Sequence, residues 1–295
     1  MYKEKLVAYM EKYKLSQSAM AKKLDTSISY LSQYLNDKHP YADKFDEKLR
    51  EFFEMAESQA GSTKKPEFVP TTISNVIMDA LGYAHIQKIM GVMDGDAGIG
   101  KTWAIRQYER QHTEAVLISV DYPISKPMGF LKALARELRV PELRRQDDLY
   151  TAIVERLKGS EKILIIDEAQ HLVYSALEVI RGIHDATDVA VVLVGNHEVY
   201  TKLVGRGEAA FAQLYSRIAI RKHMRTADIK MSDIERIFPE VETEAQKFLY
   251  EISKTRWGLR AAVNAYVNGA NSDDVSLKGL KNVIRYMGVG GNVAS

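Results

Sequence analysis

A glycine-rich run near the middle of the chain has the residue types that hold the phosphates of a nucleotide. It fits the pattern G-x-x-x-x-G-K-[ST] at every fixed position and consists of Gly95, Asp96, Ala97, Gly98, Ile99, Gly100, Lys101 and Thr102. Glycines let backbone N–H groups turn toward phosphate oxygens, and a helix that begins there adds the partial positive charge of its N-terminus. We expect Lys101 to reach the β- and γ-phosphates and Thr102 to bind Mg²⁺. The run therefore predicts a site for ATP with Mg²⁺.

Polar residues follow two apolar runs farther along the chain. Asp167 and Glu168 come directly after the run Ile163–Ile166, and Asn196 comes directly after the run Val191–Gly195. An apolar strand that ends in two carboxylates is typical of a Walker B motif. Asp167 would hold Mg²⁺, mostly through water, and Glu168 would orient and deprotonate the attacking water. Asn196 would position that water, although Gly-Asn is also a common turn pair.

These polar groups need a sheet to carry them, and the middle of the chain has the required pattern. Short β-rich runs alternate with helical periodicity over residues 69–225, which predicts an α/β domain with a parallel sheet. The expected strands are 89–93, 115–120, 162–166, 189–194 and 218–222. Before this domain, residues 57–68 have the composition of a flexible linker. After it, residues 226–295 are predicted to be a helical domain with a loose tail.

The first 56 residues have the pattern of a small helical module. Two expected helices, 17–24 and 28–36, follow the capping residues Ser16 and Ser27 and are separated by a three-residue turn. The spacing resembles the helix-turn-helix of phage repressors, except that Asp25 stands where that family usually has glycine. The expected inward face of a first helix is Leu6, Met10 and Tyr13, and the predicted DNA contacts are Lys22, Lys23, Ser27, Ser29, Tyr30, Gln33 and Tyr34. A module used only for protein contacts is the alternative.

The order of these motifs resembles that of the AAA+ ATPases. The resemblance implies that Asn196 is the sensor 1 residue. It also implies that Arg217, just before the last strand, is an arginine finger for the ATP site of a neighbouring subunit, with Arg206 as the rival candidate. Arg260 matches the sensor 2 arginine of a helical lid. Arginine suits these positions because it stays charged and can fork onto phosphate oxygens. The implied fold is a P-loop AAA+ core with a helix-turn-helix domain before it and a helical lid after it.

The layout of the whole chain resembles the B proteins of Mu-type transposable phages. The domain order carries this resemblance, together with the run Asp-Glu-Ala-Gln-His-Leu over residues 167–172. It implies a protein that assembles with ATP into a homo-oligomeric helical filament or ring on double-stranded DNA. Such a protein captures target DNA with little sequence preference and delivers it to a transposase, which it stimulates. The transposase would in turn stimulate ATP hydrolysis.

Three other interpretations fit parts of the pattern. A helicase loader or replication initiator is also an AAA+ ATPase that acts on DNA. A helix-turn-helix transcriptional regulator could use the nucleotide as a switch. An envelope-associated AAA+ ATPase has a similar Glu-Ala-Gln run, but should also have a membrane helix or a peptidoglycan-binding module, and neither pattern is visible in the sequence.

The composition narrows the setting in which the protein works. The 295 residues contain no cysteine, which excludes disulfides, thiolate catalysis and Cys-ligated zinc. The apolar runs are too short for a membrane helix, so a cytoplasmic protein without membrane contact is expected. The formal net charge is only +2, so DNA binding must use local patches. On the core, the candidates for such contacts are Arg106, Lys126, Arg144 and Arg145.

Overall fold

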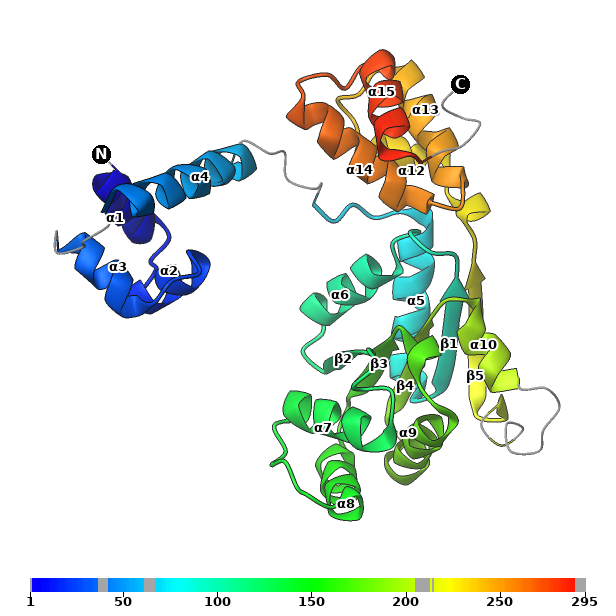
Figure 1. The fold of residues 1–295 in the computed structure, drawn as a ribbon. Coiled ribbons are helices and arrows are strands. Elements are labelled where there is room, and N and C mark those ends of the chain that lie inside the picture. Colours follow the sequence, from blue (N-terminus) through cyan, green and yellow to red (C-terminus); the bar gives the residue numbers. More distant parts are fainter. Residues whose placement is uncertain (1, 37–41, 61–66, 205–212, 214, 290–295) are drawn as a thin grey trace. The chain divides into compact units, whose positions relative to one another are not determined.

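The chain divides into two compact units, Met1–Lys64 and Lys65–Ser295 (Figure 1). The computed structural model describes residues 2–36, 42–60, 67–204, 213 and 215–289. Within these ranges, no helix combines the length and the apolar character that crossing a membrane requires.

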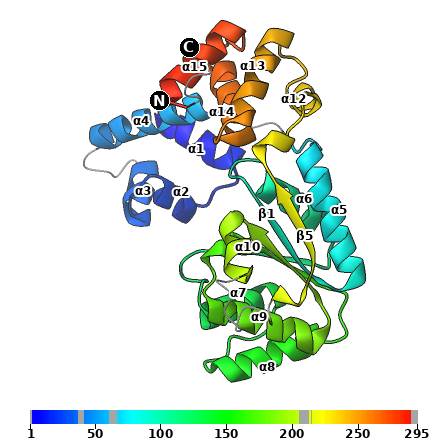
Figure 2. The ribbon, with the colours of Figure 1, turned by 90° about the vertical axis from the view of Figure 1, so that its right-hand side faces the viewer.

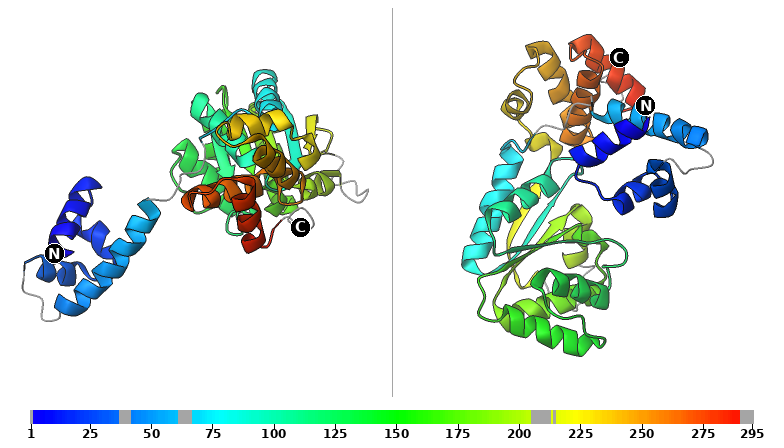
Figure 3. Two further views of the ribbon diagram at one scale, coloured as in Figure 1. Left: turned by 90° about the horizontal axis from the view of Figure 1, so that it is seen from above. Right: turned by 90° about the vertical axis from the view of Figure 1, so that its left-hand side faces the viewer.

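The smaller unit, whose ribbon is blue in Figure 3, consists of helices around one apolar core. Its helices are α1 Tyr2–Lys12, α2 Gln17–Lys23, α3 Ile28–Leu35 and α4 Ala42–Ala60. The buried residues that these helices share are Leu6, Met20, Ala21, Leu24, Leu31, Tyr34, Phe45, Leu49 and Phe53. Helix α4 continues to Ala60, so it runs into the stretch whose composition predicts a linker.

The short helices α2 and α3 begin where serine side chains can cap them. Ser16 accepts a hydrogen bond from the N–H of Ala19 at 3.2 Å, and Ser27 accepts one from the N–H of Tyr30 at 3.1 Å. Each bond satisfies a donor that the first turn of a helix would otherwise leave unpaired. Between the helices, Asp25 adopts a left-handed backbone with φ +45°, a conformation that aspartate tolerates better than most residues do.

Two expectations about aromatic residues in this unit are wrong. Tyr34 is buried rather than part of an exposed DNA-facing surface, and its hydroxyl donates to a carboxylate oxygen of Asp46. Tyr13 lies beyond the end of α1 and is 48% exposed, so it does not continue the inward face of that helix. The end of α1 leaves Tyr13 exposed, and packing against Phe45 and Asp46 of α4 buries Tyr34. Neither effect can be predicted from a three- or four-residue spacing.

The larger unit is built on a five-stranded parallel sheet with the order β2-β3-β4-β1-β5. The strands are β1 Met90–Gly95, β2 Ala115–Ser119, β3 Ile163–Asp167, β4 Ala190–Gly195 and β5 Ile218–Met224. Every strand lies within one or two residues of its predicted place. β1, β3 and β4 are buried along their whole length, as expected for strands covered on both faces.

Helices cover both faces of this sheet. One face packs on α5 Thr72–Gln87 and α6 Lys101–Gln111, and the other packs on α7 Pro127–Leu138, α8 Gln146–Leu157 and α9 Tyr174–Thr187. The short helix α10 His197–Val204 follows β4, and β5 forms the edge of the sheet beside β1 (Figure 2). All strands run in the same direction, so their carboxyl ends meet at one edge of the sheet, where the candidate site lies.

Four helices follow the sheet and stand over its carboxyl edge (Figure 1). They are α12 Met231–Ile237, α13 Thr243–Lys254, α14 Gly258–Asn271 and α15 Leu277–Met287. Their apolar residues join the same core cluster as α5 and α6, so these helices, which we call the lid, are packed onto the sheet domain. The lid is in the part of the chain where sequence periodicity predicts helices.

Candidate functional site

The glycine-rich run forms a loop between β1 and α6, at the carboxyl edge of the sheet. Gly98 and Gly100 have φ values of +76° and +97°, a region that side chains with a Cβ rarely adopt. The Nζ of Lys101 donates to the carbonyl oxygens of Gly95 and Asp96 at 2.8 and 2.7 Å. Burial lowers the pKa of Lys101, and nearby carboxylates only partly oppose this. A half-buried ammonium at a helix N-terminus is a suitable partner for phosphate oxygens.

The next two polar residues lie together as a pair of cation ligands would require. The hydroxyl of Thr102 donates to Oδ2 of Asp167 at 2.9 Å. This bond holds the carboxylate beside the hydroxyl that is expected to bind Mg²⁺, where it can accept hydrogen bonds from the waters that Mg²⁺ keeps. Burial raises the pKa of Asp167, although the hydrogen bond from Thr102 opposes the rise. A divalent cation would compensate the charge of this buried carboxylate.

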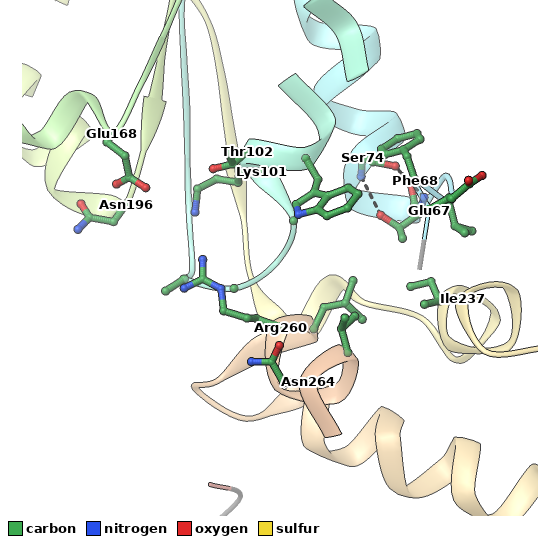
Figure 4. Close-up of a pocket in the computed structure, with 18 of the residues that line it drawn as sticks. Glu67, Phe68, Ser74, Lys101, Thr102, Glu168, Asn196, Ile237, Arg260 and Asn264 are labelled. Carbon is green, nitrogen blue, oxygen red and sulfur yellow. Dashed lines mark hydrogen bonds between the residues drawn. The ribbon is translucent and has the colours of Figure 1, made fainter. Parts of the chain in front are cut away.

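Glu168 and Asn196 lie on the side of the cavity that faces Lys101 and Thr102 (Figure 4). Glu168 leaves β3 with a left-handed backbone, φ +55°, which turns the chain at the sheet edge. Oδ1 of Asn196 accepts from the N–H of Glu198 at 2.9 Å and so caps α10. The two interpretations of Asn196, as a turn residue and as part of the site, are therefore compatible, because the same side chain caps a helix and lines the cavity.

A glutamine that stands out in the sequence only as part of a family-like run connects these two residues. Nε2 of Gln170 donates to Oε2 of Glu168 at 2.5 Å, and Oε1 of Gln170 accepts from the backbone N–H of Asn196 at 3.3 Å. Gln170 lies in the short 3-10 helix Ala169–His171 and is buried. No spacing rule identifies it, because the bond to Asn196 joins elements that only the sheet brings together.

The lid contributes residues to the wall of the cavity. Arg260 and Asn264 of α14 line the cavity opposite Lys101 (Figure 4). The backbone N–H of Arg260 donates to the carbonyl of Gly98 at 3.0 Å. The start of the lid is also tied to the phosphate loop through Asp96, whose Oδ2 accepts from the N–H of Thr226 at 2.7 Å. Arg260 is therefore brought to the loop, as its predicted lid position requires.

The cavity enclosed by these groups has a volume of about 460 Å³. Its polar end is lined by the phosphate loop, Glu168 and Asn196. Apart from the polar Glu67 and Ser74 beside Phe68 (Figure 4), its other end is lined by the apolar residues Phe68, Val69, Trp103, Ile237, Leu259 and Val263. A purine ring fits such a surface, because aromatic and aliphatic side chains cover its faces. No sequence pattern singles out these residues, which come from four separate elements and have no motif.

A second polar cluster lies behind the loop and is built on Asp94. This carboxylate is fully buried at the end of β1 and binds Nε of Arg221 at 3.1 Å, Nδ1 of His197 at 2.9 Å and Nδ1 of His223 at 2.6 Å. The two histidines and Asp94 have ligand types that bind metals, but Arg221 already compensates the charge of the carboxylate. Burial alone would raise the pKa of Asp94, and the three donors more than offset this and lower it. The cluster joins β1, α10 and β5 directly beneath the phosphate loop.

The structure places Arg217 far from the phosphate loop of its own chain. It precedes β5, whose first residue Ile218 pairs with Met90 at the beginning of β1, whereas the loop follows the end of β1. Nε of Arg217 donates to Asp185 at 2.8 Å, and this contact lowers the pKa of Asp185. The rival Arg206 lies outside the described residues.

The predicted DNA contacts are mostly exposed. In the small unit, Lys22, Lys23, Ser27, Ser29 and Gln33 are exposed, and Tyr30 is half-buried against Phe45. On the larger unit, Arg106, Lys126, Arg144 and Arg145 are exposed, at α6 and at the starts of α7 and α8. Their roles in DNA binding stay predictions.

Comparison with known proteins identifies an AAA domain and relatives among phage transposition proteins. Residues 86–203 match the family of AAA domains. The chain is 31% identical over 272 residues to the Mu-like prophage FluMu DNA transposition protein B of Haemophilus influenzae, covering 89% of this chain and 94% of that protein. It is 32% identical over 241 residues to the ATP-dependent target DNA activator B of Escherichia phage Mu, covering 79% and 76%.

Among solved structures, domain III of the Thermotoga maritima replication initiation protein DnaA is similar, with a TM-score of 0.49, 14% identity and coverage of 75% of this chain and 94% of that one. The phosphate loop, the parallel sheet and the lid belong to a P-loop ATPase of the AAA+ type. With an AAA domain and more than 30% identity over most of its length, the chain belongs to the family of B transposition proteins of Mu-like phages.

Proposed function

We propose that this protein uses ATP to assemble on double-stranded DNA and presents that DNA as a target to a transposase. The observation that carries the proposal is the site at the carboxyl edge of the sheet. Lys101, Thr102 and Glu168 line one end of a single cavity, Asp167 is hydrogen-bonded to Thr102, and Arg260 lines the cavity from the lid. The names of the relatives, one a DNA transposition protein and the other a target DNA activator, support the choice of DNA as partner.

The residues divide the work of ATP hydrolysis among them. Lys101 and the loop N–H groups would hold the phosphates, and Thr102 and Asp167 would hold Mg²⁺, whose charge offsets that of the phosphates. Glu168 would take a proton from the water whose oxygen attacks the γ-phosphorus, and the bond from that phosphorus to ADP would break. Asn196 would orient the water, and Arg260 would pair with phosphate oxygens from the lid.

A neighbouring subunit would complete the site. No position on its own chain gives Arg217 access to the loop, since the two lie at opposite ends of the sheet. If Arg217 acts on the transferred phosphoryl group, it would act in the site of another copy, which would make ATP part of the contact between subunits. DNA would favour this assembly further, because many copies bound to one duplex have a high local concentration.

The small unit supports DNA contact by its shape and charge. Its capped helices α2 and α3 leave Lys22, Lys23 and the start of α3 exposed, the position from which a helix-turn-helix meets DNA. Lysines and hydroxyl groups at such a surface bind phosphates and favour binding with little sequence preference.

Electron microscopy of the protein with duplex DNA tests the proposal. With ATP, we expect long protein–DNA filaments, and with ADP or without nucleotide much shorter assemblies. Short assemblies under all three conditions would contradict it. Closed rings that load a hexameric helicase onto single-stranded DNA would favour a helicase loader, and binding confined to one operator without DNA-stimulated turnover would favour a regulator.

A further inference from the structure

Gln170 holds the side of the site where water must be activated. Its amide has one donor end and one acceptor end, and it uses both: the donor binds Oε2 of Glu168, and the acceptor binds the N–H of Asn196. A carboxylate side chain has no N–H to offer Glu168, and an apolar one has neither group. Glutamine is therefore matched to the two partners that it joins.

The position of Gln170 is fixed by its surroundings. It is only 6% exposed, and the ammonium of Lys202 on α10 donates to its backbone carbonyl. Gly195 supplies the space for its side chain, because a Cβ there would lie 2.2 Å from Oε1 of Gln170. A buried amide with both ends bonded and a glycine beneath it has little freedom to turn.

We infer that Gln170 is a positioning residue that holds one carboxylate oxygen of Glu168 in register with Asn196 at the tip of β4. The inference rests on the proposed role of Glu168 as the base. With Oε2 fixed by the amide, Oε1 is the oxygen that accepts the proton from water. Asn196 is attached to the same amide through its backbone, so the group that takes the proton and the group that orients the water move together. Such alignment within a fraction of an ångström is what sets the rate of a positioned reaction.

Gln170→Met tests this role, because methionine has a similar length and volume but cannot form the two bonds. The full-length variant should show kcat for ATP hydrolysis, measured with DNA present, reduced roughly tenfold to hundredfold, with the ATP Kd unchanged. Gln170→Asn keeps the amide without its reach and should show the same loss.

Gln246→Met is the matched control, since Gln246 is also a buried glutamine and donates to the carbonyl of Phe238 at 2.8 Å, but in the lid. It should lower the Tm and leave both kcat and the ATP Kd as in the wild type. If Gln170→Met loses only Tm in the same way, or loses ATP affinity instead of kcat, Gln170 is structural and the inference is overturned.

A double-mutant cycle separates this inference from the proposed function. In a Glu168→Gln background, Gln170→Met should cause no further loss of kcat, because there is no carboxylate left to position. Losses that multiply would place the action of Gln170 elsewhere and overturn the inference. If Glu168→Gln alone hydrolyses ATP at the wild-type rate, the assignment of the base fails first. If Glu168→Gln is slow but Gln170→Met is normal, only the role of Gln170 fails.

Discussion

Gly98 of the phosphate loop and Gly258 at the start of the lid helix α14 meet backbone to backbone. A Cβ on Gly98 would lie 2.6 Å from the carbonyl oxygen of Trp257, and one on Gly258 would lie 2.8 Å from that of Ala97. Both glycines also have positive φ values, +76° and +64°. The loop and the lid are therefore in direct contact with no side chain between them.

We predict that Gly258→Ala weakens ATP binding by roughly tenfold or more, because a Cβ in this left-handed position costs on the order of 1 kcal/mol and also pushes the lid from the loop. The two tryptophans of the chain, Trp103 and Trp257, both lie beside the loop, so their fluorescence during an ATP titration measures the change. Gly82→Ala is the control. Gly82 lies within α5 with no atom near its absent Cβ, so this change should leave ATP binding intact. Normal affinity in Gly258→Ala would mean that the lid does not depend on this contact.

Glu168→Gln should bind ATP and DNA but hydrolyse ATP slower by roughly two orders of magnitude or more, because the amide cannot take the proton from water. Protein–DNA complexes formed with ATP should then persist. Phosphate release and the lifetime of the complexes measure the two effects, and Lys101→Ala, which should lose most ATP binding, is the comparison that cannot form them. Turnover near the wild-type rate would rule out Glu168 as the base.

Arg217→Ala should still bind ATP but lose ATP-dependent assembly and hydrolysis, if the arginine serves a neighbouring subunit. A mixture of Arg217→Ala with Lys101→Ala should regain some ATPase activity, because an interface between them joins one intact loop to one intact arginine. Arg181→Ala is the control for loss of a contact with Asp185, because Arg181, within α9, also donates to Asp185 at 3.1 Å. A mixture no more active than its separate components would count against Arg217.

Asp94→Asn should lower the free energy of unfolding by about 2 kcal/mol at pH 7, because the buried partners of the carboxylate lose a charged acceptor. The wild-type carboxyl has a lowered pKa, so its contribution is complete above the ordinary aspartate value of about 3.9 and is lost as the pH falls through the lower folded value. Urea unfolding from pH 7 to pH 3 should therefore show the two proteins converging at the acidic end. Asp79→Asn, an exposed change on α5, should have no effect at any pH. A constant difference down to pH 3 would contradict the titration of Asp94.

A fragment of residues 1–66 should fold alone and bind duplex DNA weakly, with an affinity that falls as salt rises. The double change Lys22→Ala with Lys23→Ala should reduce the slope of log affinity against log salt by about 1 for each DNA phosphate that no longer has a lysine partner. Lys5→Ala with Lys12→Ala removes the same charge from α1 and is the control. Equal effects of the two pairs would mean that the lysines act only through net charge, and no binding at low salt would favour a protein-contact module.

The sequence predicts best what is local. The loop, the strands and the carboxylates after β3 are found from contiguous residues because motif and periodicity are properties of neighbouring positions. No local pattern assigns a role to Gln170, Asp94 or Gly258, since each acts through a partner from a distant element. The expected exposure of Tyr34 is wrong for the same reason: its burial depends on α4, which no pattern around residue 34 describes.

The hydrogen bond between Asp96 and Thr226 connects the phosphate loop directly to the beginning of the lid. The chain enters the lid directly after β5, and at that point the N–H of Thr226 is held at 2.7 Å by a residue of the loop. A rotation of the four lid helices about this point must either carry Asp96 with it or break the bond. The loop and the beginning of the lid are therefore coupled by this bond, so a displacement of one of them would act directly on the other.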